Sequence, residues 1–115
     1  NLLHPDLVNY YFTPGDYINL INFSKNNNID LKKFKLNEFL SFLINEKFYV
    51  KNDFVKSYIY VLIELYFLKI FNKEINKNKI LNLYTKFIYK INDTLKYNLD
   101  NEALFLEFKS KVLNE

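Results

Sequence analysis

The apolar residues of this 115-residue chain recur mainly at helical spacing. The clearest pattern lies over residues 77–97, where a set of apolar side chains falls on one arc at 100° per residue. That set consists of Ile80, Tyr84, Phe87, Ile88, Ile91 and Leu95. The opposite arc carries Lys79, Asn82, Lys86, Lys90 and Asp93. We therefore predict an amphipathic helix over residues 77–97.

Capping signals predict where other helices begin. Thr13 precedes Pro14, which suits the first helical position, and Asp16 follows in the first turn. Asn52 and Asp100 precede apolar segments in the same way. Together with the spacing of apolar residues, these signals predict helices over residues 5–12, 14–24, 36–48, 53–71, 77–97 and from 100 onwards.

The scarcity of chain breakers indicates the fold class. The chain has one glycine and two prolines, whereas strand-rich domains need turn residues every ~8–12 positions. We therefore expect an all-α fold, a bundle of about five to six helices forming one domain over residues 1–115. The side chains expected to point inward are Tyr17, Ile18, Ile21, Phe23, Phe39, Leu40, Leu43, Ile44, Leu104, Phe108 and Val112, with Phe105 and Leu106 near the edges.

The predicted fourth helix is the most apolar segment of the chain. After Asp53, its polar residues other than tyrosines are Lys56, Ser57, Glu64 and Lys69. A helix that is apolar on all sides must be buried on all sides, within the domain or by a partner. A membrane-spanning helix needs about 20 consecutive apolar residues, and Glu64 interrupts this segment. We therefore expect a central core helix and no membrane span.

Composition adds little to the functional prediction. The chain has 18 Asn, 16 Lys, one Ala and no Arg or Gln, a bias typical of A- and T-rich codons. The formal net charge is only +3. Arginine is the side chain that pairs bidentately with guanine and phosphate, so its absence argues against sequence-specific reading of nucleic acid.

Missing residue types exclude several kinds of chemistry. The chain has no cysteine, His4 is its only histidine, and Gly15 is its only glycine. A Cys/His zinc site and a glycine-rich phosphate loop therefore cannot form, and His4, near one end, is poorly placed for a catalytic triad. We expect a protein that is not an enzyme, with no catalytic, metal-binding or cofactor-binding residues. The lack of cysteine and of a signal-peptide pattern favours a soluble intracellular protein.

Glu64 is the one candidate for an unusual carboxylate, because its neighbours Ile63 and Leu65 are apolar. Burial would disfavour its charged form and suit it to acid–base chemistry. Lys56 and Tyr60 precede it at intervals of four residues, however, and the three side chains also suit a narrow polar stripe at the surface. The surface stripe is the favoured interpretation.

The surplus of large apolar residues points to protein contacts. Aromatic side chains are enriched at protein interfaces, and ten tyrosines are more than one small core can bury with every hydroxyl satisfied. We predict a non-enzymatic helical interaction module, or a small subunit of a larger assembly, that binds a protein partner or itself. The candidate interface residues are Tyr58, Tyr66, Phe67, Phe71, Tyr10, Tyr11 and Phe12.

Two other functions remain as alternatives. Lys79, Lys86 and Lys90 share one helix face, and such a lysine stripe suits sequence-independent binding of a nucleic-acid backbone. The second alternative is a helical bundle with an apolar groove that binds an amphipathic partner helix.

Overall fold

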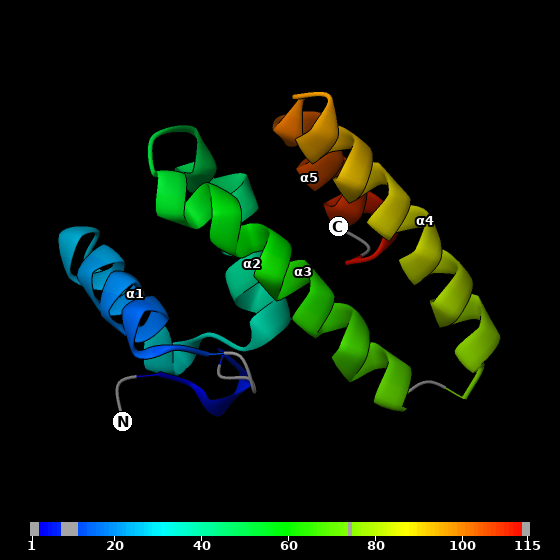
Figure 1. Ribbon diagram of the computed structural model, residues 1–115. Helices are drawn as coiled ribbons and strands as arrows, with labels where there is room; N and C mark the ends of the chain where they lie inside the picture. The colour runs from blue at the N-terminus through cyan, green and yellow to red at the C-terminus, as the bar shows by residue number, and fades with distance from the viewer. Residues whose placement is uncertain (1–2, 8–11, 74, 114–115) are drawn as a thin grey trace.

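The computed structural model describes residues 3–7, 12–73 and 75–113. Over these residues the chain forms five α-helices and three short 3-10 helices (η), with no β-strand (Figure 1), which confirms the all-α prediction. In chain order the elements are η1 (Pro5–Leu7), α1 (Pro14–Asn26), η2 (Leu31–Lys33), α2 (Leu36–Asn45), η3 (Phe48–Val50), α3 (Asp53–Lys73), α4 (Lys77–Lys96) and α5 (Asn101–Lys111).

The predicted capping residues begin the helices as expected. The Thr13 hydroxyl accepts a hydrogen bond from the Asp16 amide at 3.0 Å, and the Asp16 carboxylate accepts one from the Thr13 amide. The Asn52 side chain accepts from the Val55 amide at the start of α3. The Asp100 side chain accepts a hydrogen bond from the Glu102 amide at the start of α5. Each side chain satisfies an amide that the helix itself leaves unpaired.

Three helices are each followed, two residues after their last residue, by a residue in the left-handed conformation: Asn28 (φ 54°), Lys47 (φ 55°) and Asn98 (φ 52°). After α1 the Ile29 amide donates back to the Ser24 carbonyl, a contact typical of the Schellman motif. Asparagine tolerates this conformation better than most residues, so part of the Asn-rich composition has a local structural use.

One predicted helix is shorter than expected, and another lies partly outside the described residues. The helix predicted over 36–48 ends at Asn45, because Lys47 turns the chain and Phe48–Val50 form the separate element η3. Of the helix predicted over 5–12, residues 5–7 form a 3-10 turn and residues 8–11 lie outside the described part of the chain.

Helix α3 runs through the middle of the molecule (Figure 1). It packs against η3, α2 and α4, while α5 packs against α4 and α2. Helix α1 lies at the opposite side from α4 (Figure 1), and the Phe23 ring anchors it by meeting Phe48 edge-on at 5.1 Å. This arrangement confirms that the fourth predicted helix is central.

The core draws side chains from all five α-helices. Three rings meet where α3, α4 and α5 converge: Phe67, Phe87 and Phe108, with centroids 5.8–6.0 Å apart. Most predicted core residues are buried as expected, namely Phe23, Phe39, Leu40, Leu43, Ile44, Leu104, Phe108 and Val112. Burial of each large apolar side chain contributes about 1.5–3 kcal/mol, so these contacts dominate the stability of the fold.

Several predicted burials are wrong. Ile18 is 56% exposed because Leu20, on the opposite side of α1, takes the inward position. Leu95 is 60% exposed because α3 and α4 diverge toward the end of α4 that carries it (Figure 1). Phe105, predicted near an edge, is fully buried.

Helix α3 is not buried on every side. Val61 and Leu68 occupy one face of the helix and are 41% and 59% exposed. The neighbouring helices cover the side that carries Ile59, Leu62 and Ile63. No helix in the described ranges is long and apolar enough to cross a membrane.

Candidate functional site

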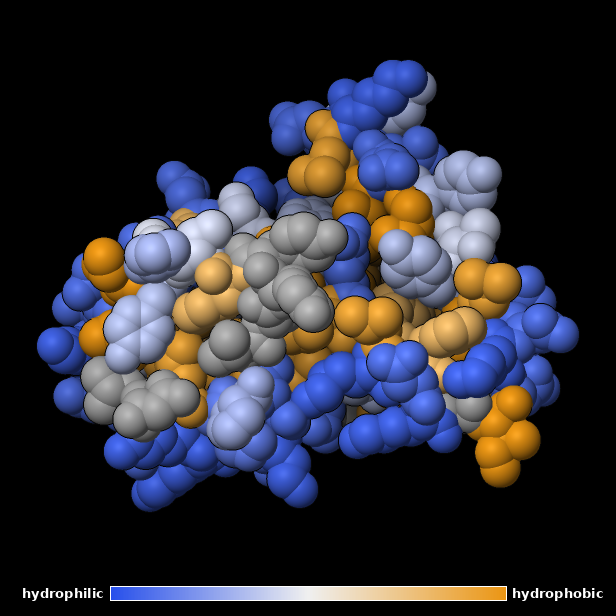
Figure 2. Space-filling model, turned by 60° about the horizontal axis from the view of Figure 1, so that its bottom comes forward, coloured by the Kyte–Doolittle hydropathy of each residue, from blue (hydrophilic) through white to orange (hydrophobic). Residues whose placement is uncertain are grey.

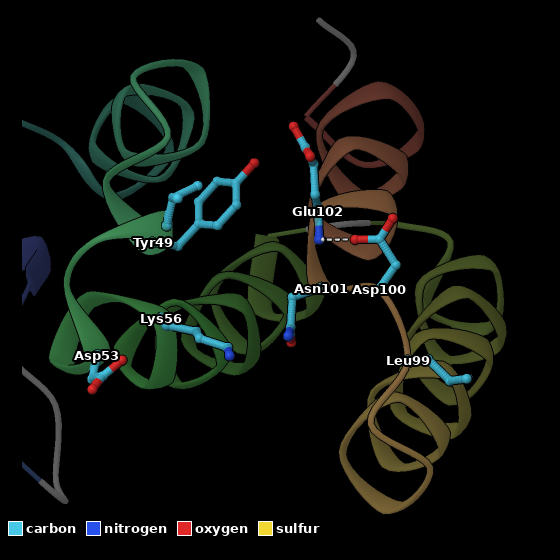
Figure 3. Close-up of a pocket in the computed structure, with 8 residues that line it drawn as sticks. Tyr49, Asp53, Lys56, Leu99, Asp100, Asn101 and Glu102 are labelled. Carbon is cyan, nitrogen blue, oxygen red and sulfur yellow. Dashed lines mark hydrogen bonds between the residues drawn. The ribbon is translucent and has the colours of Figure 1, made fainter.

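An open pocket of about 330 Å³ lies where η3 and the start of α3 face the start of α5 (Figure 3). We call it the α5 pocket. It is lined by Tyr49, Val50, Asp53, Lys56, Leu99, Asp100, Asn101 and Glu102. Val50 comes from one wall and Leu99 from the other, and their side chains are 64% and 51% exposed. The pocket therefore combines a polar lining with exposed apolar groups from both walls.

Local signals in the sequence position both walls of the α5 pocket. Asn52 starts α3 just before Asp53, and Asp100 starts α5 through its hydrogen bond to the Glu102 amide at 2.9 Å (Figure 3). The left-handed turn at Asn98 places Leu99 so that its amide donates to the Thr94 carbonyl at 3.0 Å. The pocket thus brings together two helix N-termini and one helix C-terminus.

Aromatic and polar contacts hold the two walls together. The Phe105 ring on α5 meets the rings of Tyr49 and Tyr60, with centroids 5.0 Å and 5.3 Å away. The Tyr60 hydroxyl donates a hydrogen bond to the Asn101 side-chain oxygen. At the edge of the pocket, the Lys47 ammonium lies 3.1 Å from the Glu102 carboxylate. These contacts join elements about 40–55 residues apart in sequence.

The Tyr49 hydroxyl is the least satisfied polar group of the pocket. Tyr49 is only 5% exposed, and its hydroxyl makes no hydrogen bond of normal geometry in the described part of the chain. Figure 3 shows the hydroxyl directed across the pocket toward Glu102. Burial, followed by the nearby charge of Glu102, a hydrogen-bonding contact with the Glu102 carboxylate and the charge of Asp100, raises the pKa of Tyr49 to about 12. The hydroxyl is therefore protonated at neutral pH.

The α5 pocket is acidic. Three carboxylates line it, those of Asp53, Asp100 and Glu102, against one ammonium, that of Lys56. Asp53 and Asp100 are exposed. No cluster of three or more potential metal-ligating groups occurs among the described residues. With carboxylate oxygens and a tyrosine hydroxyl, the site offers hydrogen-bond acceptors and negative charge to a ligand.

The predicted interface residues do not form one surface. Tyr58 and Phe67 are core residues, 4% and 2% exposed, because α3 turns both toward the interior. Tyr66 and Phe71 are half-buried; the Tyr66 ring meets Phe108 edge-on, and Phe71 lies beneath the Lys77 ammonium.

The remaining predicted interface residues precede α1. Phe12 is half-buried and meets the Tyr17 ring edge-on at 6.4 Å. Tyr10 and Tyr11 lie outside the described residues. Because they are buried, Tyr58 and Phe67 cannot belong to a contact surface. A contact role for the other predicted residues stays a prediction.

Two further candidate groups are placed by the structure. Glu64 is exposed on α3, in keeping with the surface interpretation of this carboxylate.

Of the lysine stripe, Lys79 and Lys86 are exposed, whereas the Lys90 ammonium pairs with the Glu107 carboxylate of α5. Glu107 also lies 3.0 Å from the Lys111 ammonium, and these two lysines hold the pKa of Glu107 below its ordinary value. The lysine stripe is therefore partly neutralised.

None of the residues that line the α5 pocket was predicted as a site residue. The sequence does predict the two helix starts at Asn52 and Asp100, but no local signal shows that they face one another. Comparison with protein-family models, with curated proteins and with solved structures finds no match to this chain.

Proposed function

We propose that this chain is a non-enzymatic helical module that binds a protein partner through the face that carries the α5 pocket. The observation that supports the proposal is the placement of Val50 and Leu99, two exposed apolar side chains on opposite walls of an acidic pocket. Two further exposed apolar residues, Leu95 and Tyr97, lie in the same chain segment as Leu99. Exposed apolar groups gathered around polar ones are typical of binding sites.

Other exposed apolar residues give weaker support for a contact site. Figure 2 shows one face of the molecule, on which separate apolar groups lie among hydrophilic side chains. Single apolar side chains of this kind are normal on protein surfaces. Val50 and Leu99 differ from them because they line the same pocket as Tyr49, whose hydroxyl is buried without a hydrogen bond of normal geometry in the described ranges.

Nucleic-acid binding through the lysine stripe has less support. The Lys90 ammonium forms an ion pair with the Glu107 carboxylate. The other two stripe lysines, Lys79 and Lys86, are exposed to solvent. Affinity for a phosphate backbone grows with the number of phosphates neutralised, and two lysines give a weak, strongly salt-dependent interaction.

Affinity purification of the tagged protein from its own cells, after nuclease treatment, tests the proposal. The bait is compared with the double variant Val50→Ser/Leu99→Ser and with Leu68→Ser, a matched control on the exposed face of α3. We expect a stoichiometric protein partner with wild type and Leu68→Ser, and its loss with the double variant. If the partner still copurifies with the double variant, the pocket face is not part of the contact. Loss of every copurifying chain on nuclease treatment would favour the lysine stripe.

A further inference from the structure

We propose that the connection between α3 and α4 docks on the surface of an anionic lipid bilayer. We call this segment, residues 72–73 and 75–79, the α3–α4 turn. It lies at the end of α3 (Figure 1), whereas Asp53 of the α5 pocket lies at the start of the same helix, about 30 Å away at 1.5 Å per residue. The inference is therefore separate from the proposed function, because one end of the molecule can bind a protein while the other contacts a membrane.

Ile75 is the apolar group that would enter the bilayer. Its side chain is 98% exposed, the highest exposure of any large apolar residue that the structure describes. Its described neighbours in the turn, Asn72, Lys73 and residues 76–79, are all exposed as well. The turn therefore holds its one apolar side chain out in water, where that side chain contributes nothing to the core. Transfer of such a side chain from water to the boundary between headgroups and acyl chains is favourable.

The charge of the turn complements an anionic surface. Lys73, Lys77 and Lys79 surround Ile75 within seven residues, and the one acid among them in the sequence is Glu74, which leaves a net charge of +2. None of the three lysines forms an ion pair within the described ranges. Anionic lipids attract lysines held close to the membrane, and each lysine adds to the attraction.

Two of these lysines do not serve the stability of their own helix. Lys77 and Lys79 lie in the first turn of α4, where the helix dipole disfavours a cation and no acid is present. The first turns of the other α-helices each carry an acid: Asp16, Glu38, Asp53 and Glu102. The positive charge at the start of α4 is thus balanced neither by an ion pair nor by the helix dipole, and it faces solvent beside Ile75.

The apolar side chain distinguishes a membrane from a nucleic acid, which lysines also attract. Proteins that bind single strands without sequence preference stack bases on aromatic rings, and the turn has no aromatic residue. An isoleucine between lysines instead suits contact with headgroups and acyl chains at the same time. One apolar side chain and three cations give weak, reversible binding at the surface.

Cosedimentation of the full chain with lipid vesicles at low salt tests the inference. The vesicles consist of phosphatidylcholine, with or without phosphatidylserine. The variants are Ile75→Ser and Lys73→Gln/Lys79→Gln, which change exposed side chains. Lys77 is left unchanged, because its ammonium donates to the Phe71 carbonyl at 2.8 Å.

Matched control variants change the same residue types elsewhere on the surface. Ile18→Ser replaces an isoleucine of α1 that is 56% exposed, and Lys32→Gln/Lys33→Gln removes two exposed lysines of η2. The second control lowers the net charge of the chain by the same amount as Lys73→Gln/Lys79→Gln, so it separates a local effect from one of overall charge.

We expect binding to vesicles that contain phosphatidylserine and much weaker binding to phosphatidylcholine alone. Ile75→Ser and Lys73→Gln/Lys79→Gln should each weaken binding about tenfold or more, and each control variant less than about twofold. No binding to phosphatidylserine vesicles, or equal binding by wild type and Ile75→Ser, would overturn the inference. Binding of a single-stranded oligonucleotide that Lys73→Gln/Lys79→Gln abolishes, without binding to vesicles, would assign these lysines to nucleic acid instead.

Discussion

The Lys69 ammonium on α3 lies 2.6 Å from the Asp6 carboxylate of η1, so an ion pair ties the start of the described chain to its central helix. Asp6 also accepts a hydrogen bond from the Leu36 amide at the first residue of α2. The Lys69 contact is the main cause that holds the pKa of Asp6 below its ordinary value of 3.8. One carboxylate thus joins three elements that are distant in sequence.

The ion pair predicts a pH-dependent contribution to stability. The folded state holds Asp6 ionised at lower pH than the unfolded chain does, so the contribution is complete above pH 3.8 and is lost as pH falls through the lower folded pKa. Asp6→Asn should reduce the free energy of unfolding by about 1 kcal/mol at neutral pH, and by much less in strong acid. Urea denaturation of Asp6→Asn, Lys69→Gln and the double variant measures this coupling. If Asp6→Asn lowered the free energy of unfolding equally at neutral pH and in strong acid, this ion-pair contribution would be contradicted.

A second prediction compares two lysines of α4. Lys90→Ala should lower stability by up to about 1 kcal/mol, because it removes the partner of Glu107 between α4 and α5. Lys86→Ala, four residues earlier and exposed, should change stability by less than about 0.5 kcal/mol. Thermal denaturation of both variants provides the measurement, and equal effects would show that the interhelical pair contributes nothing.

A third prediction separates the core of α3 from its exposed face. Phe67 contacts Tyr84, Phe87 and Phe108, so Phe67→Ala should cost about 3–5 kcal/mol and lower the melting temperature sharply. The adjacent Leu68 is 59% exposed, and Leu68→Ala should stay within about 0.5 kcal/mol of wild type. A large loss from Leu68→Ala would mean that this face of α3 is covered.

A fourth prediction concerns the tyrosine hydroxyls. Tyr60→Phe removes the hydrogen bond to Asn101 and should cost about 1 kcal/mol. Tyr49→Phe should change stability by less than about 0.5 kcal/mol at neutral pH, because the Tyr49 hydroxyl lacks a hydrogen bond of normal geometry in the described part of the chain. Chemical denaturation of the two variants distinguishes them, and a larger cost for Tyr49→Phe would show that this hydroxyl is already satisfied in the free protein.

The sequence predicts the parts of this fold that depend on near neighbours. Thr13, Asn52 and Asp100 each form a cap with an amide two or three residues away, and all three were recognisable as caps. The end of α2 was missed, because a left-handed lysine at position 47 has no signal comparable to a glycine.

Contacts between helices could not be predicted in the same way. The segment over α3 is apolar on nearly every side, so periodicity could not show that Tyr58 and Phe67 face the interior while Leu68 faces out. The α5 pocket forms because Phe105 and Asn101 meet Tyr49 and Tyr60 across the fold, and no pattern within either segment encodes that meeting.

Partner binding at the α5 pocket is tested most directly by hydrogen exchange, measured by mass spectrometry, on the complex with the copurified partner and on the free protein. Binding through the α5 pocket should add protection over residues 47–56 and 97–102, the two walls of the pocket, and change little over residues 79–90, which carry the lysine stripe. Protection over residues 79–90 with none at the pocket walls would show that the partner binds at the lysine stripe and not at the pocket.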